Sequence, residues 1–196
     1  MITTKKGDSV KRVAILLLLP CAAAFAEAQL YFGAGWAGAT EYFTVTNPGT
    51  DPEEEKALFN SAQIKAGYGD IKGYALELDF GYGRYDKNIF SPKDTDYYYF
   101  DLSLIKAFDF HIGVFPFFKV GFGTGELEVD RTLVNSISSG SFYGGIGTYI
   151  PIAFGFDFEA SVIYRDKSWE DLQMVGAQVE SGSYIVEPYL GIDYRF

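Results

Sequence analysis

The chain has 196 residues, a length that predicts one domain. Aromatic residues make up 18% of it and glycine occurs 22 times, which favours strands over helices. Mean hydropathy is too low for a bundle of membrane helices, and the formal net charge of −10 argues against nucleic acid as a partner.

The N-terminus has the pattern of a secretory signal peptide. An apolar run extends from Val13 to Ala26, and Ala24-Phe25-Ala26 fits a small-x-small cleavage site. The basic residues before this run are Lys5, Lys6, Lys11 and Arg12. The run is too short for a membrane helix. We therefore predict a signal peptide over residues 1–26, with cleavage after Ala28 as the alternative, and a mature domain over residues 27–196.

The one cysteine, Cys21, lies within this segment. A lipoprotein signal also ends at a cysteine, but it requires a small residue in the position that Pro20 occupies here. Removal of the signal peptide leaves no cysteine, so disulfides are excluded from the mature domain. It also leaves 12 basic and 25 acidic residues, a formal charge of about −13.

Beyond the signal peptide, apolar residues alternate with polar or small residues in eight blocks. Side chains alternate across a strand, so each block predicts a strand with one apolar and one polar face. The predicted strands span residues 28–38, 61–69, 73–86, 95–107, 112–128, 141–150, 154–165 and 183–196. The third block is the clearest, the fifth is aromatic on both faces at its start, and the faces of the glycine-rich sixth block cannot be assigned.

The predicted connections alternate in length. Those at 39–60, 87–94, 129–140 and 166–182 are long, whereas those at 70–72, 108–111 and 151–153 are short. Asp51-Pro52-Glu53-Glu54 predicts a short helix in the first long connection, and Ser168 to Asp171 resembles a capping box. Short turns at one end and long loops at the other are typical of outer-membrane β-barrels, which place the short turns in the periplasm.

The last block ends the chain on a phenylalanine, with apolar residues at every second position before it: Leu190, Ile192, Tyr194 and Phe196. This pattern resembles the C-terminal signature of bacterial outer-membrane β-barrels. The whole mature chain resembles the small OmpA-like and OmpX-like members of that class.

The resemblance implies an all-β fold, an eight-stranded antiparallel up-and-down transmembrane β-barrel after an N-terminal signal peptide. It also implies a location in the bacterial outer membrane, in contact with the lipid bilayer and lipopolysaccharide. In that class the barrel insertion machinery recognises the last strand.

The polar faces of the predicted strands carry charges that we place inside the barrel. They are Lys65, Glu77, Asp79, Asp101, Lys119, Asp157, Glu159, Arg165, Glu187 and Arg195. Such a set forms either a polar pore or a salt-bridged plug, and the plug is favoured because side chains fill an eight-stranded barrel. The acids outnumber the bases, so any ion current would prefer cations.

Aromatic residues crowd the predicted strand ends, where interfacial girdles explain them better than a ligand-stacking site. Near the first long loop these are Trp36, Tyr42 and Phe43, and near the short turns they are Tyr68, Tyr74, Phe108, Phe110, Phe154 and Phe196.

Catalysis is not expected. The one histidine, His111, lies at a predicted short turn, away from the outer rim where lipid chemistry would occur, and no serine is placed to pair with it. The run from Gly121 to Gly125 lies inside a strand and opens no helix, so it does not indicate a nucleotide site. No His/Cys cluster indicates a transition-metal site, and the acidic stretch 51–55 predicts a solvated loop, with weak Ca²⁺ binding as the alternative. We expect no cofactor.

These observations favour a structural or surface-interaction role, similar to that of an adhesin, in which the long loops bind an extracellular ligand. The alternative is a narrow, cation-preferring diffusion channel, and a lipid-modifying outer-membrane enzyme ranks third. A soluble lipocalin-type barrel is the architectural rival, but its apolar face would point inward around a pocket.

Overall fold

The computed structural model describes residues 28–46, 51–90, 95–129, 135–170, 172–174 and 177–196. The predicted signal peptide, residues 1–26, lies outside the described residues. Within the described ranges, no helix has the length and apolar character needed to cross a membrane.

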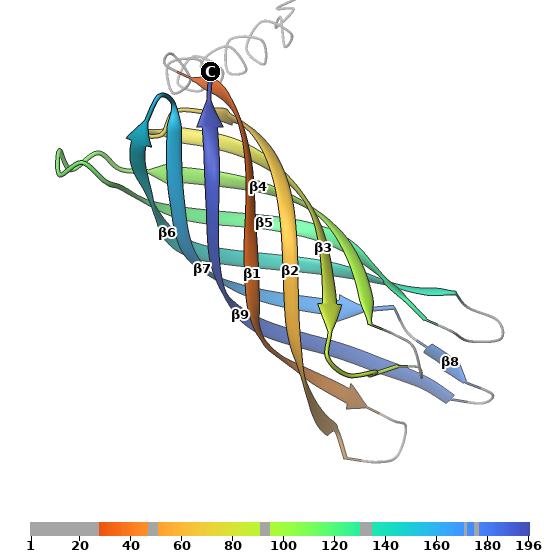
Figure 1. The fold of residues 1–196 in the computed structure, drawn as a ribbon. Helices are drawn as coiled ribbons and strands as arrows, with labels where there is room; N and C mark the ends of the chain where they lie inside the picture. Colours follow the sequence, from red (N-terminus) through yellow and green to blue (C-terminus); the bar gives the residue numbers. More distant parts are fainter. Residues whose placement is uncertain (1–27, 47–50, 91–94, 130–134, 171, 175–176) are drawn as a thin grey trace, which may run out of the picture.

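The described chain is built from antiparallel strands. They are β1 (Gln29–Thr46), β2 (Glu53–Gly69), β3 (Tyr74–Tyr85), β4 (Asp96–Ala107), β5 (Phe115–Glu128), β6 (Ser136–Ala153), β7 (Phe156–Trp169), β8 (Leu172–Met174) and β9 (Ala177–Arg195). Each of the long strands pairs with its neighbour in the chain, and β1 pairs with β9, so the eight long strands close into an up-and-down barrel (Figure 1). The short β8 pairs only with the first residues of β9.

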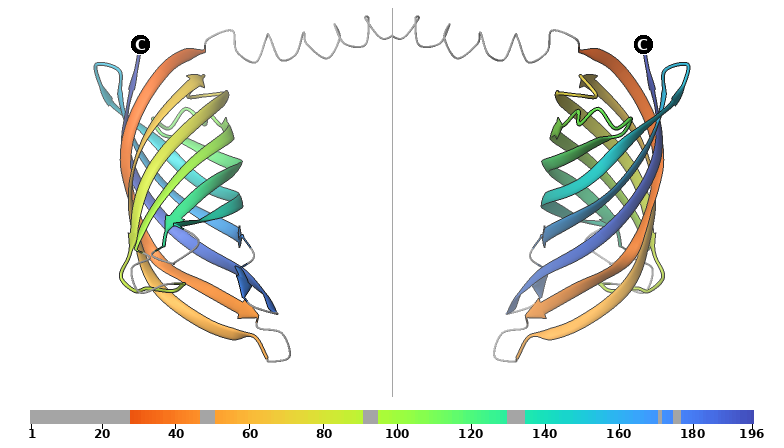
Figure 2. Two further views of the ribbon diagram at one scale, coloured as in Figure 1. Left: turned by 90° about the vertical axis from the view of Figure 1, so that its right-hand side faces the viewer. Right: turned by 90° about the vertical axis from the view of Figure 1, so that its left-hand side faces the viewer.

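The barrel has two different ends. The end that we call the turn end carries the short connections 70–73, 108–114 and 154–155, together with the start of β1 and the C-terminus (Figure 1). The loop end carries the last residues of β1, β3, β5 and β7, the first residues of β2, β4, β6 and β9, and also β8. Figure 2 shows the strands inclined to the barrel axis, as closure of a sheet requires.

The predicted eight-stranded barrel is confirmed, but several predicted boundaries at the loop end are wrong. Residues 39–46 and 53–60 were assigned to a loop, yet they form the ends of β1 and β2, paired as far as Val45 and Glu53. The predicted helix at Asp51 is absent, because Glu53 and Glu54 belong to β2. Likewise β6 starts at Ser136, and β7 continues to Trp169, so it includes the first two residues of the predicted capping box.

Two boundaries at the turn end also differ from prediction. β5 begins at Phe115 rather than near residue 112, and β6 continues through Pro151 to Ala153. The turn that follows consists of Phe154 and Gly155, both with positive φ angles, 55° and 85°. Positive φ is unfavourable for a bulky residue, yet a two-residue hairpin turn of this kind requires it.

Side chains alternate between the interior and the outer surface along every long strand. Outward positions in the middle of the barrel carry exposed Leu, Ile, Val, Phe, Tyr and Trp side chains. The register also assigns the faces of the two unclear strands. In β5, Phe115 and Phe117 point inward and Phe118 outward, and in β6 Tyr143 and Tyr149 point inward.

Glycines on inward positions make room for buried tyrosine rings. The ring of Tyr143 crosses Gly121, its partner on β5, where a Cβ atom would lie 2.4 Å from the tyrosine Cζ and 2.5 Å from the carbonyl oxygen of Leu102. The rings of Tyr31 and Tyr99 cross their partners Gly67 and Gly81 in the same way. These positions therefore need glycine for space rather than for backbone freedom.

We predict that Gly121→Ala destabilises the folded barrel by about 1–3 kcal/mol, because the new methyl group must displace a packed ring or the backbone. Gly140→Ala is the matched control on β6, since a Cβ there meets nothing within 4 Å. Its effect should stay within about 0.5 kcal/mol. Urea unfolding in phospholipid vesicles measures both changes, and equal midpoints would show that the glycine is not needed for ring packing.

Candidate functional site: the barrel interior

The barrel interior has a charged layer between two apolar clusters. The inward residues of β4 show this order from the loop end to the turn end: Tyr97, Tyr99, Asp101, Ser103, Ile105 and Ala107. The two tyrosines belong to the cluster at the loop end, and Ile105 and Ala107 belong to the cluster at the turn end. On this strand the charged residue, Asp101, thus lies away from both openings.

All ten predicted interior charges point into the barrel. Those that are buried are Lys65, Glu77, Asp79, Asp101, Lys119, Asp157, Glu159, Arg165 and Glu187. Arg195 is half-buried at the turn end, where its Nε lies 2.5 Å from Asp157 Oδ2. The structure brings these residues together in ion pairs, some between neighbouring strands and some, such as Lys65–Glu159 and Arg165–Asp101, across the barrel.

Lys65 lies at the centre of the charged layer. Its Nζ atom is 3.4 Å from Glu77 Oε2 and 3.0 Å from Asp193 Oδ1, and it also pairs with Glu159. Lys119 binds the other oxygen of Glu77. Two lysines and three carboxylates from five strands therefore form one connected network, which ties opposite walls of the barrel together.

Arg165 forms a second group in the charged layer. Its Nη1 and Nη2 atoms donate to Asp101 Oδ1 and Oδ2 at 2.9 and 2.7 Å, a bidentate pair with the planar geometry that guanidinium favours. Its Nε atom lies 3.4 Å from Glu187 Oε1, and the guanidinium carbon is 4.5 Å from the ring centre of Tyr143. Acids on both sides and a ring face compensate the buried charge.

A third group, nearer the loop end, was missed by sequence reasoning. Lys167 Nζ lies 2.7 Å from Glu41 Oε2, and the hydroxyl groups of Tyr85 and Ser183 donate to the same carboxylate at 2.9 and 2.5 Å. The indole N–H of Trp169 donates to Ser183 Oγ at 2.8 Å. Glu41 and Lys167 were assigned to loops, so only recognition of the longer strands could have placed them inside.

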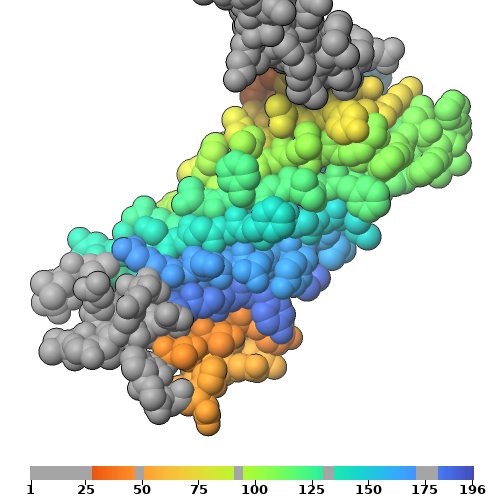
Figure 3. All heavy atoms as spheres, turned by 180° about the vertical axis from the view of Figure 1, so that it is seen from behind, coloured from red at the N-terminus to blue at the C-terminus, as the bar shows by residue number. Residues whose placement is uncertain are grey.

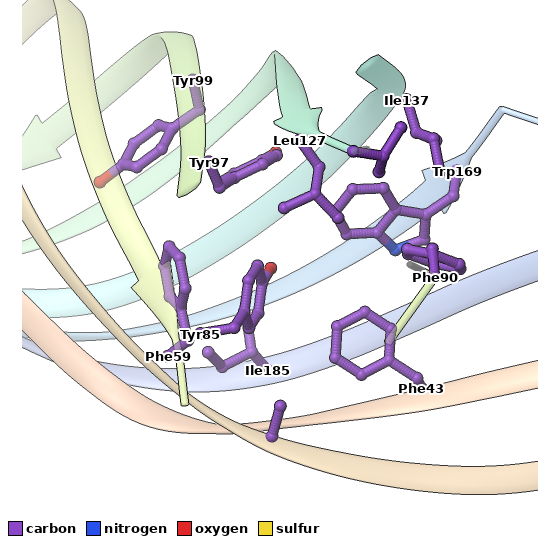
Figure 4. Packing of buried hydrophobic residues seen from close by; sticks show 12 residues of the cluster. Phe43, Phe59, Tyr85, Phe90, Tyr97, Tyr99, Leu127, Ile137, Trp169 and Ile185 are labelled. Carbon is purple, nitrogen blue, oxygen red and sulfur yellow. The ribbon is translucent and has the colours of Figure 1, made fainter. Parts of the chain in front are cut away.

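Aromatic and aliphatic side chains fill the loop end of the interior (Figure 4). The aromatic members of this loop-end cluster are Phe43, Phe59, Tyr85, Phe90, Tyr97, Tyr99 and Trp169. Phe43 contacts Phe90 and Trp169 with ring centres 6.1 and 6.0 Å apart. Phe43 was predicted to belong to an interfacial girdle, but it is 1% exposed and lies inside the barrel.

The turn end of the interior is also filled. The turn-end cluster consists of Tyr31, Ala75, Ile105, Ala107, Phe115, Phe117 and Tyr149, with Ile71 packed against it. The rings of Phe117 and Tyr149 are tilted by 30° with their centres 4.6 Å apart. Together with the loop-end cluster, it leaves the charged layer buried from both sides.

The interior carries more acid than base. Among the described residues, the inward acids are Glu41, Glu77, Asp79, Asp101, Asp157, Glu159, Glu187 and Asp193, and the inward bases are Lys65, Lys119, Arg165, Lys167 and Arg195. Asp79 and Asp101 are direct neighbours across β3 and β4. The predicted excess of acid is therefore present, but in a packed interior rather than along an open lumen.

His111 lies in the turn between β4 and β5, at the turn end. Its backbone N–H donates to Asp109 Oδ1 at 2.7 Å, and this bond lowers the pKa of the Asp109 carboxyl. The imidazole Nδ1 is 3.5 Å from the same oxygen, and 87% of the side chain is exposed. His111 is thus separated from the charged layer by the turn-end cluster.

The polar interior, the apolar outer surface and the closed edge define a class of protein. Soluble barrels bury their apolar face, whereas this barrel exposes it around its circumference, as a transmembrane β-barrel must. The C-terminal residues belong to this apolar outer surface, because Leu190, Ile192, Tyr194 and Phe196 all point outward and are 38–66% exposed. The structure is that of a small integral membrane barrel.

Comparisons with known proteins agree with this class. Residues 13–196 match the family model described as the outer membrane protein beta-barrel domain, and the chain belongs to that family. It is therefore a protein of the bacterial outer membrane, surrounded by the lipid bilayer and its lipopolysaccharide. By the rule for such barrels, the turn end is periplasmic and the loop end extracellular.

Solved structures with the same fold include neisserial surface protein A, at 22% identity and a TM-score of 0.52, with 86% of this chain and 99% of that chain covered. The β-barrel domain of Pseudomonas aeruginosa OprF is 16% identical, with a TM-score of 0.44 and coverage of 84% and 99%. The Ail protein of Yersinia pestis is 17% identical, with a TM-score of 0.39 and coverage of 84% and 98%. A search of curated proteins finds no match.

We predict that Lys65→Met destabilises the barrel by about 3–5 kcal/mol, because it leaves Glu77, Glu159 and Asp193 buried without their shared cation. Lys56→Met on the outer surface is the control and should change stability by less than about 0.5 kcal/mol. Urea midpoints in vesicles measure both. Equal stability of the two variants would mean that the interior lysine is dispensable.

Proposed function

We propose that this protein is a non-conducting surface protein that binds an extracellular partner through its loop end, in the manner of an adhesin. The observation that carries the proposal is the filled interior. Apolar clusters close both ends, and every lysine and arginine in the charged layer is paired with a carboxylate. Because such a barrel has no open lumen, its exposed loop end is the part that can bind a partner.

The loop end extends well beyond the apolar belt. On the outer surface the belt gives way to polar residues in register across neighbouring strands, Asn60, Arg84 and Asp96, with Arg84 Nε 2.8 Å from Asp96 Oδ1. From this level the β1–β2 hairpin continues to the Val45–Glu53 pair. Paired strands, rather than the long loops that were predicted, therefore hold much of this surface in a fixed shape.

The exposed charge at the loop end favours a basic partner. The described acids at this end are Asp51, Glu53, Glu54, Glu55, Asp86, Asp96, Glu126, Glu128, Asp166 and Glu170, and the described bases are Lys56, Arg84 and Lys87. Opposite potentials speed association and select partners. We therefore assign a cationic protein segment as the chemical class of the ligand.

The second candidate is a narrow, cation-preferring diffusion channel, which the excess of interior acid favours. Conduction would require displacement of both apolar clusters, so this function ranks below surface binding. We also propose that the chain has no catalytic activity. In support, His111 lies at the turn end, which is periplasmic, and its imidazole contacts Asp109.

The last strand indicates which partner the chain contacts during assembly. We propose that the barrel insertion machinery recognises β9 through Leu190, Ile192, Tyr194 and Phe196. These side chains form one outward row, and β9 pairs with β1 to close the barrel. A strand that makes the closing contact is available to another protein until closure.

The binding proposal predicts that cells displaying the chain retain a lysine-rich peptide and that Glu53→Gln/Glu54→Gln/Glu55→Gln weakens this retention. Loss of three exposed pairings should cost about 1–2 kcal/mol, or about five- to thirtyfold in affinity. Asp109→Asn at the turn end is the control and should have no effect. Unchanged affinity in the triple variant, or preference for a sulfated polysaccharide over the peptide, would contradict the assignment of the ligand.

A further inference from the structure

An apolar groove lies on the lipid-facing surface of the barrel, outside the interior described above. Its volume is about 840 Å³, and it crosses β5, β6, β7 and β9. These strands follow one another across the face seen in Figure 3. The groove does not depend on the loop end, so its role is separate from the proposed surface binding.

The register explains why the wall is hollowed at this point. One outward row crosses β5, β6 and β7 through Pro116, Thr148 and Ala160, whose short side chains form the floor, and it ends on β9 at Leu190. The next row, toward the loop end, crosses Phe118, Ile146 and Val162, which form a higher wall, and it ends on β9 at Pro188. From β5 to β7, a row of small residues therefore lies beside a row of large ones and makes a channel across these strands, and Leu190 borders it on β9.

Two aromatic rings extend the groove at its β5 end. Phe108 and Phe110, on the turn after β4, stack with ring centres 6.1 Å apart, and both line the groove. Phe108 also meets the edge of Phe118 at 5.8 Å. This end of the groove therefore lies at the periplasmic turns, at the level where lipid headgroups meet hydrocarbon.

The dimensions of the groove suit one acyl chain. From β5 to β9 it crosses three strand spacings, or about 14 Å. One leaflet of a bilayer with a hydrocarbon core about 30 Å thick holds chains about 15 Å long. A flexible chain can follow such a groove, whereas the convex wall of a second barrel would bridge over it.

A lysine lies at the β5 end of the groove. Lys106 lies directly across from Phe118 on the outer surface, and its Nζ atom is 4.2 Å from the ring centre of Tyr74 and 5.5 Å from that of Phe108. Within the described ranges, no carboxylate forms an ion pair with Lys106. A cation at the edge of an apolar groove complements an anionic headgroup attached to a chain.

The geometry points to a binding site for an anionic phospholipid of the periplasmic leaflet, with one acyl chain in the groove and the phosphate on Lys106. Lipopolysaccharide is excluded as the occupant by position, since the groove opens toward the periplasmic turns. The bound lipid would fill a gap in the wall that neighbouring lipids, packed side by side, would otherwise leave.

Native mass spectrometry of the whole chain, expressed in bacteria and extracted from the outer membrane, tests the site. With phosphatidylglycerol added, the wild-type barrel should retain one lipid. Ala160→Leu fills the floor and should lower its occupancy at least fivefold, whereas Ala62→Leu, at an outward alanine on β2, should not. Equal retention by the two variants would overturn the proposal.

Lys106→Gln tests the headgroup contact. It should reduce the preference for phosphatidylglycerol over phosphatidylcholine at least threefold. Lys56→Gln is the matched control, because Lys56 also lies over a tyrosine ring, at 4.9 Å from the centre of Tyr42, but at the loop end. No change with Lys106→Gln, retention of lipopolysaccharide in place of phospholipid, or a dimer lost on Ala160→Leu would each contradict the assignment.

Discussion

The pairing of β1 with β9 is the constraint on which the rest of this structure depends. Backbone groups in a bilayer cannot bond to water, so the sheet must close, and closure with eight strands leaves an interior only wide enough for side chains. Every inward residue must then fit against the others and every inward charge must find a partner there. The tyrosines that cross glycines and the ion pairs that connect opposite walls both follow from that narrow space.

The same constraint divides the molecule by function. The charged layer holds the walls together, and the apolar clusters shield it from water at both ends. Two outer surfaces remain available for interaction. One is the acidic extracellular end, which extended strand pairs hold in place. The other is the lipid-facing wall, whose shape follows the size of its outward side chains. The packed interior and the restriction of interactions to the outer surface both follow from closure with eight strands.

The alternation of apolar and polar residues predicts the strand segments within the membrane, but it predicts the segments beyond the membrane less well. Outward positions beyond the belt face water, so polar residues such as Thr40 and Thr44 replace apolar ones and the alternation disappears. Glu41 and Lys167 then look like loop residues although they are buried partners. Locally, Asp51-Pro52-Glu53-Glu54 has the pattern of a helix start, yet pairing of Glu53 with Val45 across the hairpin prevails. The inward direction of the ten charges could be predicted because they lie within the apolar belt, where the alternation is clear. The ion-pair partners of each charge depend on the register between strands, which a single sequence does not give.

The most direct test of a closed interior is current across a planar bilayer that contains the refolded barrel, with folding verified by circular dichroism of the same sample. The proposed function predicts no current, because the loop-end and turn-end clusters pack against the charged layer from both sides. Steady current that prefers cations would contradict it. That result would mean that the acidic interior is hydrated and that the barrel works as a channel.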